Sequence, residues 1–242
     1  MTLSYSSADP PKRFYVSVDC AAADGGFAVR LDGRIPRSPE GKPLVLPTAA
    51  LAQMIAEEWC AQDKSIRLAT MPATRLAWTA LDRIPAARAE VASEVANYAA
   101  SDLLCYFADE PDALAQRQES LWAPLLNWAR TKLQLDFQST RSLLHAPQSQ
   151  ATLQAVRDLA AAEGDFGLAG LAFAAALFGS AILAFALRRG VIAGEGAFQL
   201  SRLEAAFQEE RWGVDEEAAA RTRALEAEAR MAELWFHALD AG

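Results

Sequence analysis

The sequence predicts an α+β protein in which a small N-terminal antiparallel β-containing domain is followed by a larger, all-helical domain. Hydrophobic residues alternate with polar ones in the first part of the chain, a period of two that is typical of strands. From residue 48 onward they recur with a period of 3.6, which is typical of amphipathic helices. With 242 residues, 52% of them hydrophobic, the chain is long enough to bury a substantial core.

Two alternating segments and a tight turn define the predicted sheet. In RFYVSV, the hydrophobic Phe14, Val16 and Val18 fall on one face, and FAVRL repeats the pattern after ADGG. Asp32 and Gly33 then supply the positive φ angles that a tight hairpin turn requires. Four prolines in RIPRSPEGKPLVLP limit the following strands to short, bent or edge segments. We therefore expect a small, twisted antiparallel sheet.

Helical periodicity dominates the rest of the chain. Thr48 is the predicted N-cap of a helix that carries Leu51, Ile55 and Trp59 on one side. Further helices are predicted at 72–81, 86–99, 113–132, 150–162, 166–188, 195–211 and 215–239. The change of period places a domain boundary between residues 65 and 85, and we expect the two domains to be 1–75 and 76–242.

The segment 166–187, FGLAGLAFAAALFGSAILAFAL, contains no charged residue, and two interpretations fit it. Its length and the following Arg188 and Arg189 are those of a membrane-spanning helix. However, eight alanines, three glycines and a serine make it only moderately apolar, and no Trp or Tyr marks its ends. A helix buried at the centre of a bundle is also apolar all round. We favour the buried helix and expect no stable membrane insertion.

Charge and cysteine content argue against several classes of function. The formal net charge is −8, and residues 203–242 hold ten acidic and four basic side chains. Nucleic-acid binding needs lysines and arginines that displace counterions, so no nucleic-acid partner is expected. Cys20, Cys60 and Cys105 form neither a disulfide framework nor a paired metal motif, which favours a reducing compartment, and Cys105 fits a small core residue. The first residues show the features of neither a secretory signal nor a transit peptide.

The sequence contains no recognisable catalytic or metal-binding motif. Its two histidines, His145 and His237, lie outside any nucleophile or zinc pattern, and no glycine-rich phosphate loop opens a helix. We therefore expect neither a metal nor a cofactor. One enzymatic alternative stays open, in which Asp102, Glu57 or Glu58 acts in a carboxylate-lined cleft between the domains. Asp102 fits a helix N-cap equally well.

The stretch FQEERWGVDEE is predicted to form a corner between two helices. Gly213 fits the left-handed residue that ends a helix, and Asp215 fits the N-cap of the next one. Glu210 lies in register with the hydrophobic face of the first helix, and Glu204 lies on its flank. Trp212 allows two interpretations: it packs beneath the corner, or it forms an exposed edge that recognises a partner. From the residues alone we favour the packed arrangement.

Seven stretches, beginning at Lys12 and covering nearly the whole chain in order, carry a family resemblance. They are KRFY, GFAVRLDGRIPRSP, LPTAALAQMIAEEWCAQ, TMPATRLAWTALDR, SDLLCYFADEP, LWAPLLNW and SRLEAAFQEERWG. Together they resemble the ATP synthase assembly chaperones that escort the alpha subunit of the catalytic head, a family called assembly factor twelve. The departures are mild: Ser38 stands where threonine is usual, Ala73 where leucine is common and Phe107 where arginine is frequent.

The resemblance implies an ATP-independent chaperone, not an enzyme, with a C-terminal orthogonal helical bundle. Its client would be the unassembled alpha subunit, which aggregates unless it is covered before assembly with the beta subunit. The family requires a glutamate near the Trp-Gly pair, which we assign to Glu210, with Glu204 as the weaker match. Trp212, Gly213 and Asp215 complete the predicted partner-binding surface. The resemblance further implies a cytoplasmic, bacterial protein whose eukaryotic relatives work in the mitochondrial matrix.

Overall fold

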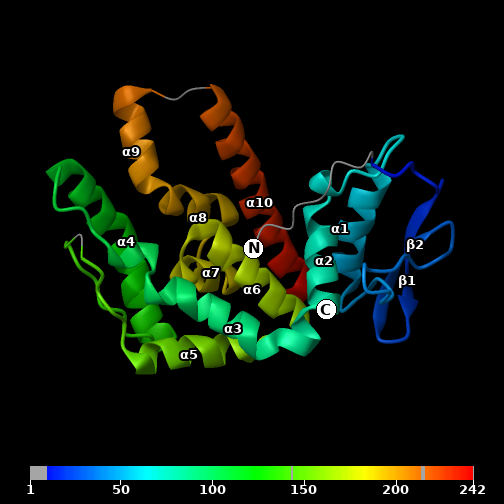
Figure 1. The fold of residues 1–242 in the computed structure, drawn as a ribbon, viewed down its shortest axis with the longest axis horizontal. Coiled ribbons are helices and arrows are strands. Elements are labelled where there is room, and N and C mark those ends of the chain that lie inside the picture. Colours follow the sequence, from blue (N-terminus) through cyan, green and yellow to red (C-terminus); the bar gives the residue numbers. More distant parts are fainter. Residues whose placement is uncertain (1–9, 143, 214–215, 242) are drawn as a thin grey trace. The chain divides into compact units, whose positions relative to one another are not determined.

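The computed structural model describes residues 10–142, 144–213 and 216–241. The chain forms two compact units: unit 1 is Met1–Trp78 with Ala238–Gly242, and unit 2 is Thr79–His237. Within the described residues, unit 1 holds a small antiparallel sheet, and unit 2 consists of helices and their connections (Figure 1). The predicted α+β fold class is therefore confirmed.

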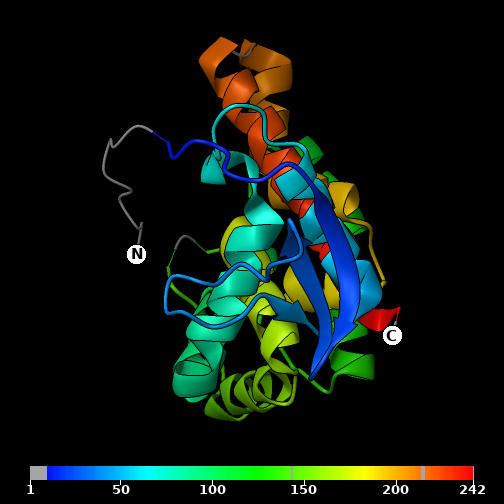
Figure 2. The same cartoon turned by 90° about the vertical axis from the view of Figure 1, so that its right-hand side faces the viewer.

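Unit 1 is built on a three-stranded antiparallel sheet in the order β1-β2-β3. Its strands are β1 (Val18–Ala23), β2 (Gly26–Leu31) and β3 (Val45–Leu46). After β2 the chain turns at Asp32 and Gly33, whose φ angles are 48° and 77°, so the predicted tight turn is confirmed. Helix α1 (Ala49–Cys60) packs against the sheet and lies behind the blue strands in Figure 2.

The first alternating segment is not a strand before Val18, where β1 begins, and its buried side is the opposite of the one predicted. Phe14 and Val16 are 72% and 88% exposed, whereas Tyr15 between them is buried. Tyr15 takes the inner position because its hydroxyl donates a hydrogen bond of 2.7 Å to the carbonyl of Trp59, and its ring packs edge-on to the indole. Alternation alone does not reveal which face is buried when the polar end of a tyrosine finds a partner inside.

A side-chain cap begins helix α1 of unit 1. The Thr48 hydroxyl accepts a hydrogen bond of 3.1 Å from the N–H of Leu51, which confirms the predicted N-cap of α1. The same hydroxyl donates to the carbonyl of Ala238, 2.6 Å away, so one oxygen joins the start of α1 to the end of the chain. A 3-10 turn, Leu68–Thr70, precedes α2 (Pro72–Asp82), along which the chain passes into unit 2.

The helices of unit 2 enclose an alanine-rich core. They are α3 (Ile84–Ala100), α4 (Asp112–Lys132), α5 (Gln150–Ala161), α6 (Asp165–Phe178), α7 (Ala181–Arg188), α8 (Gly194–Ser201), α9 (Leu203–Trp212) and α10 (Glu216–Asp240). Helix α7 is buried from Ala181 to Leu187, and α6 packs against both α3 and α7. Small side chains at these positions allow close approach, as at Gly170, where a Cβ atom would lie 2.8 Å from the rings of Trp235 and Phe236.

The long apolar segment is two helices, not the single helix predicted over 166–188. Helix α6 ends at Gly179, whose φ is 64°, and Ser180 then caps α7 by accepting a hydrogen bond of 3.0 Å from the N–H of Leu183. The Gly-Ser pair in the sequence is a stop signal followed by a start signal. Among the described residues, no helix is long and apolar enough to cross a membrane.

The predicted helix 195–211 is also interrupted, because α8 ends at Ser201 and α9 begins at Leu203. The Ser201 hydroxyl donates a hydrogen bond of 2.7 Å to the carbonyl of Phe198, and the N–H of Arg202 donates to the same carbonyl. No glycine or proline marks this junction, so the helical period of the sequence continues through it without a break signal.

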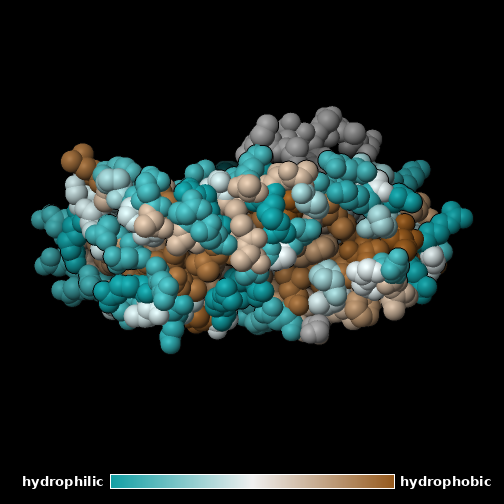
Figure 3. Space-filling model, turned by 90° about the horizontal axis from the view of Figure 1, so that it is seen from below, coloured by the Kyte–Doolittle hydropathy of each residue, from teal (hydrophilic) through white to brown (hydrophobic). Residues whose placement is uncertain are grey.

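Hydrophobic residues on the surface do not by themselves mark a binding site. The face shown in Figure 3 is largely hydrophilic, with hydrophobic residues gathered in separate patches between hydrophilic ones. Such patches are normal, since more than half of a typical protein surface is apolar. A functional site therefore needs a second argument from position, charge or geometry.

Candidate functional site

The end of α9 presents the most exposed aromatic ring in unit 2 among the described residues. Trp212 is 84% exposed, so the prediction that it packs beneath the corner is wrong. The buried side of α9 is occupied by Leu203 and Phe207. Trp212 comes nine residues after Leu203, which at about 100° per residue places it on the opposite side of the helix. The second interpretation, an exposed edge, is the one that fits this geometry.

Gly213 ends α9 as predicted, but it does not adopt the left-handed helical conformation predicted for it. Its φ is 80° and its ψ is 174°, so the chain leaves the helix in an extended rather than a left-handed helical conformation. Its N–H donates a hydrogen bond of 2.9 Å to the carbonyl of Glu209, which closes the last turn. Because an L side chain rarely adopts this φ, glycine is required by the backbone. Asp215, the predicted N-cap of α10, lies outside the described residues.

Glu210 forms a two-armed ion pair that sequence reasoning did not find. Its carboxylate oxygens accept hydrogen bonds of 2.8 and 3.2 Å from Arg117 on α4, which is 93 residues away. The Arg117 guanidinium also lies 5.4 Å from the ring centroid of Phe207, while Arg211 stands over that ring at 4.2 Å. The hydrogen bond from Arg117 lowers the pKa of Glu210 and raises that of Arg117. Glu210 is thus an ionised, exposed carboxylate whose charge is already balanced.

Glu204, in the first turn of α9, is held by a buried amide. The side-chain nitrogen of Gln118 donates to its carboxylate at 2.7 Å, and the amide oxygen of Gln118 accepts from the N–H of Ala108 at 2.6 Å. Gln118 is fully buried, so its donor needs a partner. Although Glu204 is exposed, it therefore has a structural role, which is to accept the hydrogen bond of a buried amide. No local sequence pattern indicates this role.

The carboxylates of the enzymatic alternative each have partners within their own unit. Glu58, in unit 1, accepts hydrogen bonds of 2.7–2.8 Å from the N–H groups of Ala73 and Thr74 and from the Thr74 hydroxyl. Burial raises its pKa. Glu57 accepts a hydrogen bond from Gln53. Both glutamates lie on α1. Glu58 binds the first turn of α2, and Glu57 binds a side chain of its own helix.

Asp102, in unit 2, is a fully buried cap for two helical segments. It accepts from the N–H of Leu104 at 3.1 Å, as the N-cap prediction expected. It also accepts from the Ser180 hydroxyl at 2.7 Å and from the N–H of Ile182 at 3.0 Å, at the break between α6 and α7. Burial raises its pKa to about 6. Cys105 is buried as predicted, and burial raises the pKa of its thiol.

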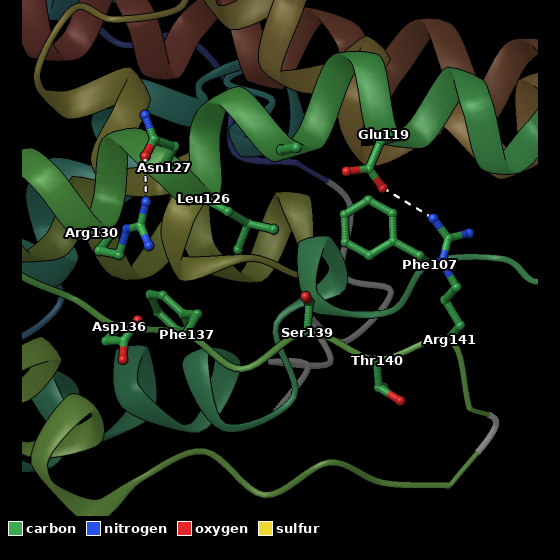
Figure 4. Close-up of a pocket in the computed structure, with 11 residues that line it drawn as sticks. Phe107, Glu119, Leu126, Asn127, Arg130, Asp136, Phe137, Ser139, Thr140 and Arg141 are labelled. Carbon is green, nitrogen blue, oxygen red and sulfur yellow. Dashed lines mark hydrogen bonds and ion pairs between the residues drawn. The ribbon is translucent and has the colours of Figure 1, made fainter.

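A hollow of about 400 Å³ lies between α4 and the segment that follows it. Figure 4 shows the side chains that line it. Two of its charged side chains are paired: Arg141 donates to Glu119 at 3.1 Å, and Arg130 donates to Asn127 at 2.9 Å (Figure 4). The part of the chain that the structure describes holds no group of three or more His, Cys, Asp or Glu residues that could bind a metal ion.

Comparison with known proteins identifies the family. The sequence model of the ATP12 chaperone protein family matches residues 12–130. Atp12 from Paracoccus denitrificans is similar in structure, with 40% identity, a TM-score of 0.87 and coverage of 95% of this chain and 98% of that one. The Atu1473 protein of Agrobacterium tumefaciens is 38% identical, with a TM-score of 0.87 and coverage of 95% and 86%. The mitochondrial protein atp12 of Schizosaccharomyces pombe is 26% identical over 219 residues, which is 86% of this chain and 75% of the relative.

The fold and these likenesses define the class: a chaperone with a small β-containing part and a helical bundle. The chain belongs to the ATP12 chaperone family. This membership supports a role as a chaperone in ATP synthase assembly.

Proposed function

We propose that this protein binds the unassembled alpha subunit of the F-type ATP synthase catalytic head and prevents its aggregation until the beta subunit replaces it. The chaperone acts by covering a surface, without ATP, a cofactor or any reaction of its own. It works in the bacterial cytoplasm. Family membership supports the class of function, and the exposed Trp212, two residues after the ion-paired Glu210 at the end of α9, supports the place of contact.

An exposed tryptophan is the observation that carries this proposal. Burying an indole against a partner removes a large apolar area from water, and tryptophan is enriched among the residues that dominate binding energy. Within the described residues, Trp212 makes no contact with another aromatic ring, and it is 84% exposed. The ring is therefore available to be buried against another molecule. Glu204, Glu210 and Gly213 form the rest of the proposed surface, to which we also assign Asp215, a residue outside the described part of the chain.

The charge of unit 2 suits a client with a basic surface. Unit 2 contains 22 acidic and 14 basic residues, so it carries the whole formal charge of −8, and unit 1 has no net charge. Complementary charge accelerates encounter and orients the partners, whereas the buried aromatic ring supplies affinity. A transient holder with this division of roles releases its client when a larger, permanent interface competes.

The Glu210–Arg117 ion pair provides a matched test of the contact. Glu210→Lys and Arg117→Ala both break the pair, but only the first removes the carboxylate. If Glu210 contacts the client, Glu210→Lys weakens capture of purified alpha subunit at least tenfold, while Arg117→Ala, which frees the carboxylate, binds as well as the wild type or better. Equal losses in both variants show that the ion pair matters only for the structure of the chaperone. Circular dichroism of each variant checks that the fold is kept.

A further inference from the structure

A groove of about 1030 Å³ runs beside α9 in unit 2. It lies between α9, the start of α4 and the segment that follows the 3-10 turn Leu103–Cys105. Its apolar lining includes Phe107 and Leu114, which are 8% and 5% exposed, together with Ala205 on α9. A hollow of this size matches the upper range of ligand pockets and has room for several side chains of a peptide.

The rim of the groove is negatively charged. Asp109, Glu110 and Glu204 line it, and Arg141 is the one basic residue among its lining. The Arg141 guanidinium is already engaged by Glu119 at 3.1 Å and by the carbonyl of Ala108 at 3.0 Å. Within the described part of the chain, neither Asp109 nor Glu110 is in an ion pair. Negative charge at the rim favours a positively charged side chain of a ligand, and the apolar floor favours an apolar side chain next to it.

The wall of the groove leads to the exposed tryptophan. Glu204 and Gln208 line the groove, and they precede Trp212 by eight and four residues on the same helix. Residues spaced by four lie on one face of a helix, so Trp212 continues the stripe that forms this wall. Glu210, by contrast, faces α4 through Arg117. The groove and the exposed ring therefore belong to one continuous surface, which is larger than the corner alone.

We propose that this groove, hereafter the α9 groove, receives a segment of the client that presents an arginine or lysine beside an apolar side chain. The cation lies among Asp109, Glu110 and Glu204, the apolar neighbour covers Phe107 and Leu114, and the following part of the client reaches Trp212. This inference rests on the proposed function, because it assigns a second contact to the same client.

Two groove variants, each with a matched control, test the proposal with purified alpha subunit as the probe. The double variant Asp109→Asn/Glu110→Gln removes two rim charges, and Asp24→Asn/Asp63→Asn removes two exposed charges in unit 1. Gln208→Trp fills the groove from an exposed position, and Gln199→Trp adds the same ring on α8. The α9 groove predicts that both groove variants bind the alpha subunit about tenfold more weakly, and that both controls bind as the wild type does. The loss from the charge variant should shrink at high salt.

A photo-crosslinking amino acid at position 208 or 199 of the full chain reports the contact directly. Crosslinks from position 208 are expected on an alpha-subunit peptide with a basic and an apolar residue, and none from position 199. If the alpha subunit binds the wild type and all four variants equally, the α9 groove is not its site, although the proposed function stands. If the alpha subunit does not bind the wild type at all, both proposals fail. Crosslinks from position 208 to an acidic segment also overturn the groove proposal.

Discussion

Replacing Asp102 by Asn tests whether one buried carboxylate joins the two halves of the apolar segment. The carboxylate accepts hydrogen bonds from Leu104, Ser180 and Ile182, and an amide has only one oxygen with which to accept them. An Asn oxygen that keeps the first two turns its NH₂ group toward the N–H of Ile182, which leaves that donor buried and unpaired. Such a loss costs about 1–3 kcal/mol.

The pH dependence of the same variant separates the charge from the geometry. Burial raises the Asp102 pKa from 3.8 to about 6, so the folded protein holds this proton more tightly than the unfolded chain. The resulting stabilisation is complete below pH 3.8 and is lost as the pH rises through about 6. Its full size is roughly 3 kcal/mol, of which about 1 kcal/mol separates pH 5 from pH 7.

Urea unfolding at pH 5 and pH 7, followed by circular dichroism, measures the effect. The difference in unfolding free energy between wild type and Asp102→Asn should be larger at pH 5 than at pH 7 by about 1 kcal/mol. Asp109→Asn, which removes a carboxylate at an exposed position, serves as the control for the loss of a charge. If wild type and Asp102→Asn lose or gain stability in parallel over this range, Asp102 is not the buried, proton-binding cap described here.

Three further predictions follow from packing and exposure. Gly170→Ala places a methyl group 2.8 Å from the Trp235 ring and should cost about 1–3 kcal/mol of unfolding free energy in a urea titration; an unchanged midpoint would contradict the close packing of α6. A maleimide should modify the exposed Cys60 in the native protein but spare the buried Cys105, as mass spectrometry of digests can show, and equal labelling would refute the assigned burial. Trp212→Ala should leave the melting temperature within about 1 °C of the wild type, because the ring is 84% exposed, and a large drop would mean that it is packed.

Local chemistry made part of the fold predictable. The Thr48 cap and the Asp32-Gly33 turn were found because their signals lie within four residues of one another, and the structure confirms both. The break at Ser180 is not predicted, although Gly-Ser is a local signal, because the unbroken run of apolar residues indicates one continuous helix. Periodicity therefore identified the helical region correctly but not where its helices end.

The contacts around the candidate site were not predictable from the sequence, because they join distant residues. Arg117 and Glu210 are 93 residues apart, and Gln118 and Glu204 are 86 apart. No local sequence pattern indicates that the Gln118 side chain on α4 is buried and donates a hydrogen bond to Glu204 on α9. The hydrophobicity of Trp212 predicts a buried ring, but its position on α9, on the side opposite to Leu203, places the ring outside.

The central claim is that this chaperone keeps the alpha subunit soluble through the surface that contains Trp212. The most direct measurement is light scattering of purified alpha subunit as it is diluted from denaturant, alone, with wild type, with Trp212→Ala, or with Leu234→Ala as a control for loss of an exposed hydrophobic side chain. The proposal predicts suppressed aggregation with wild type and with Leu234→Ala, and little suppression with Trp212→Ala. Aggregation that proceeds equally in all four samples would contradict it.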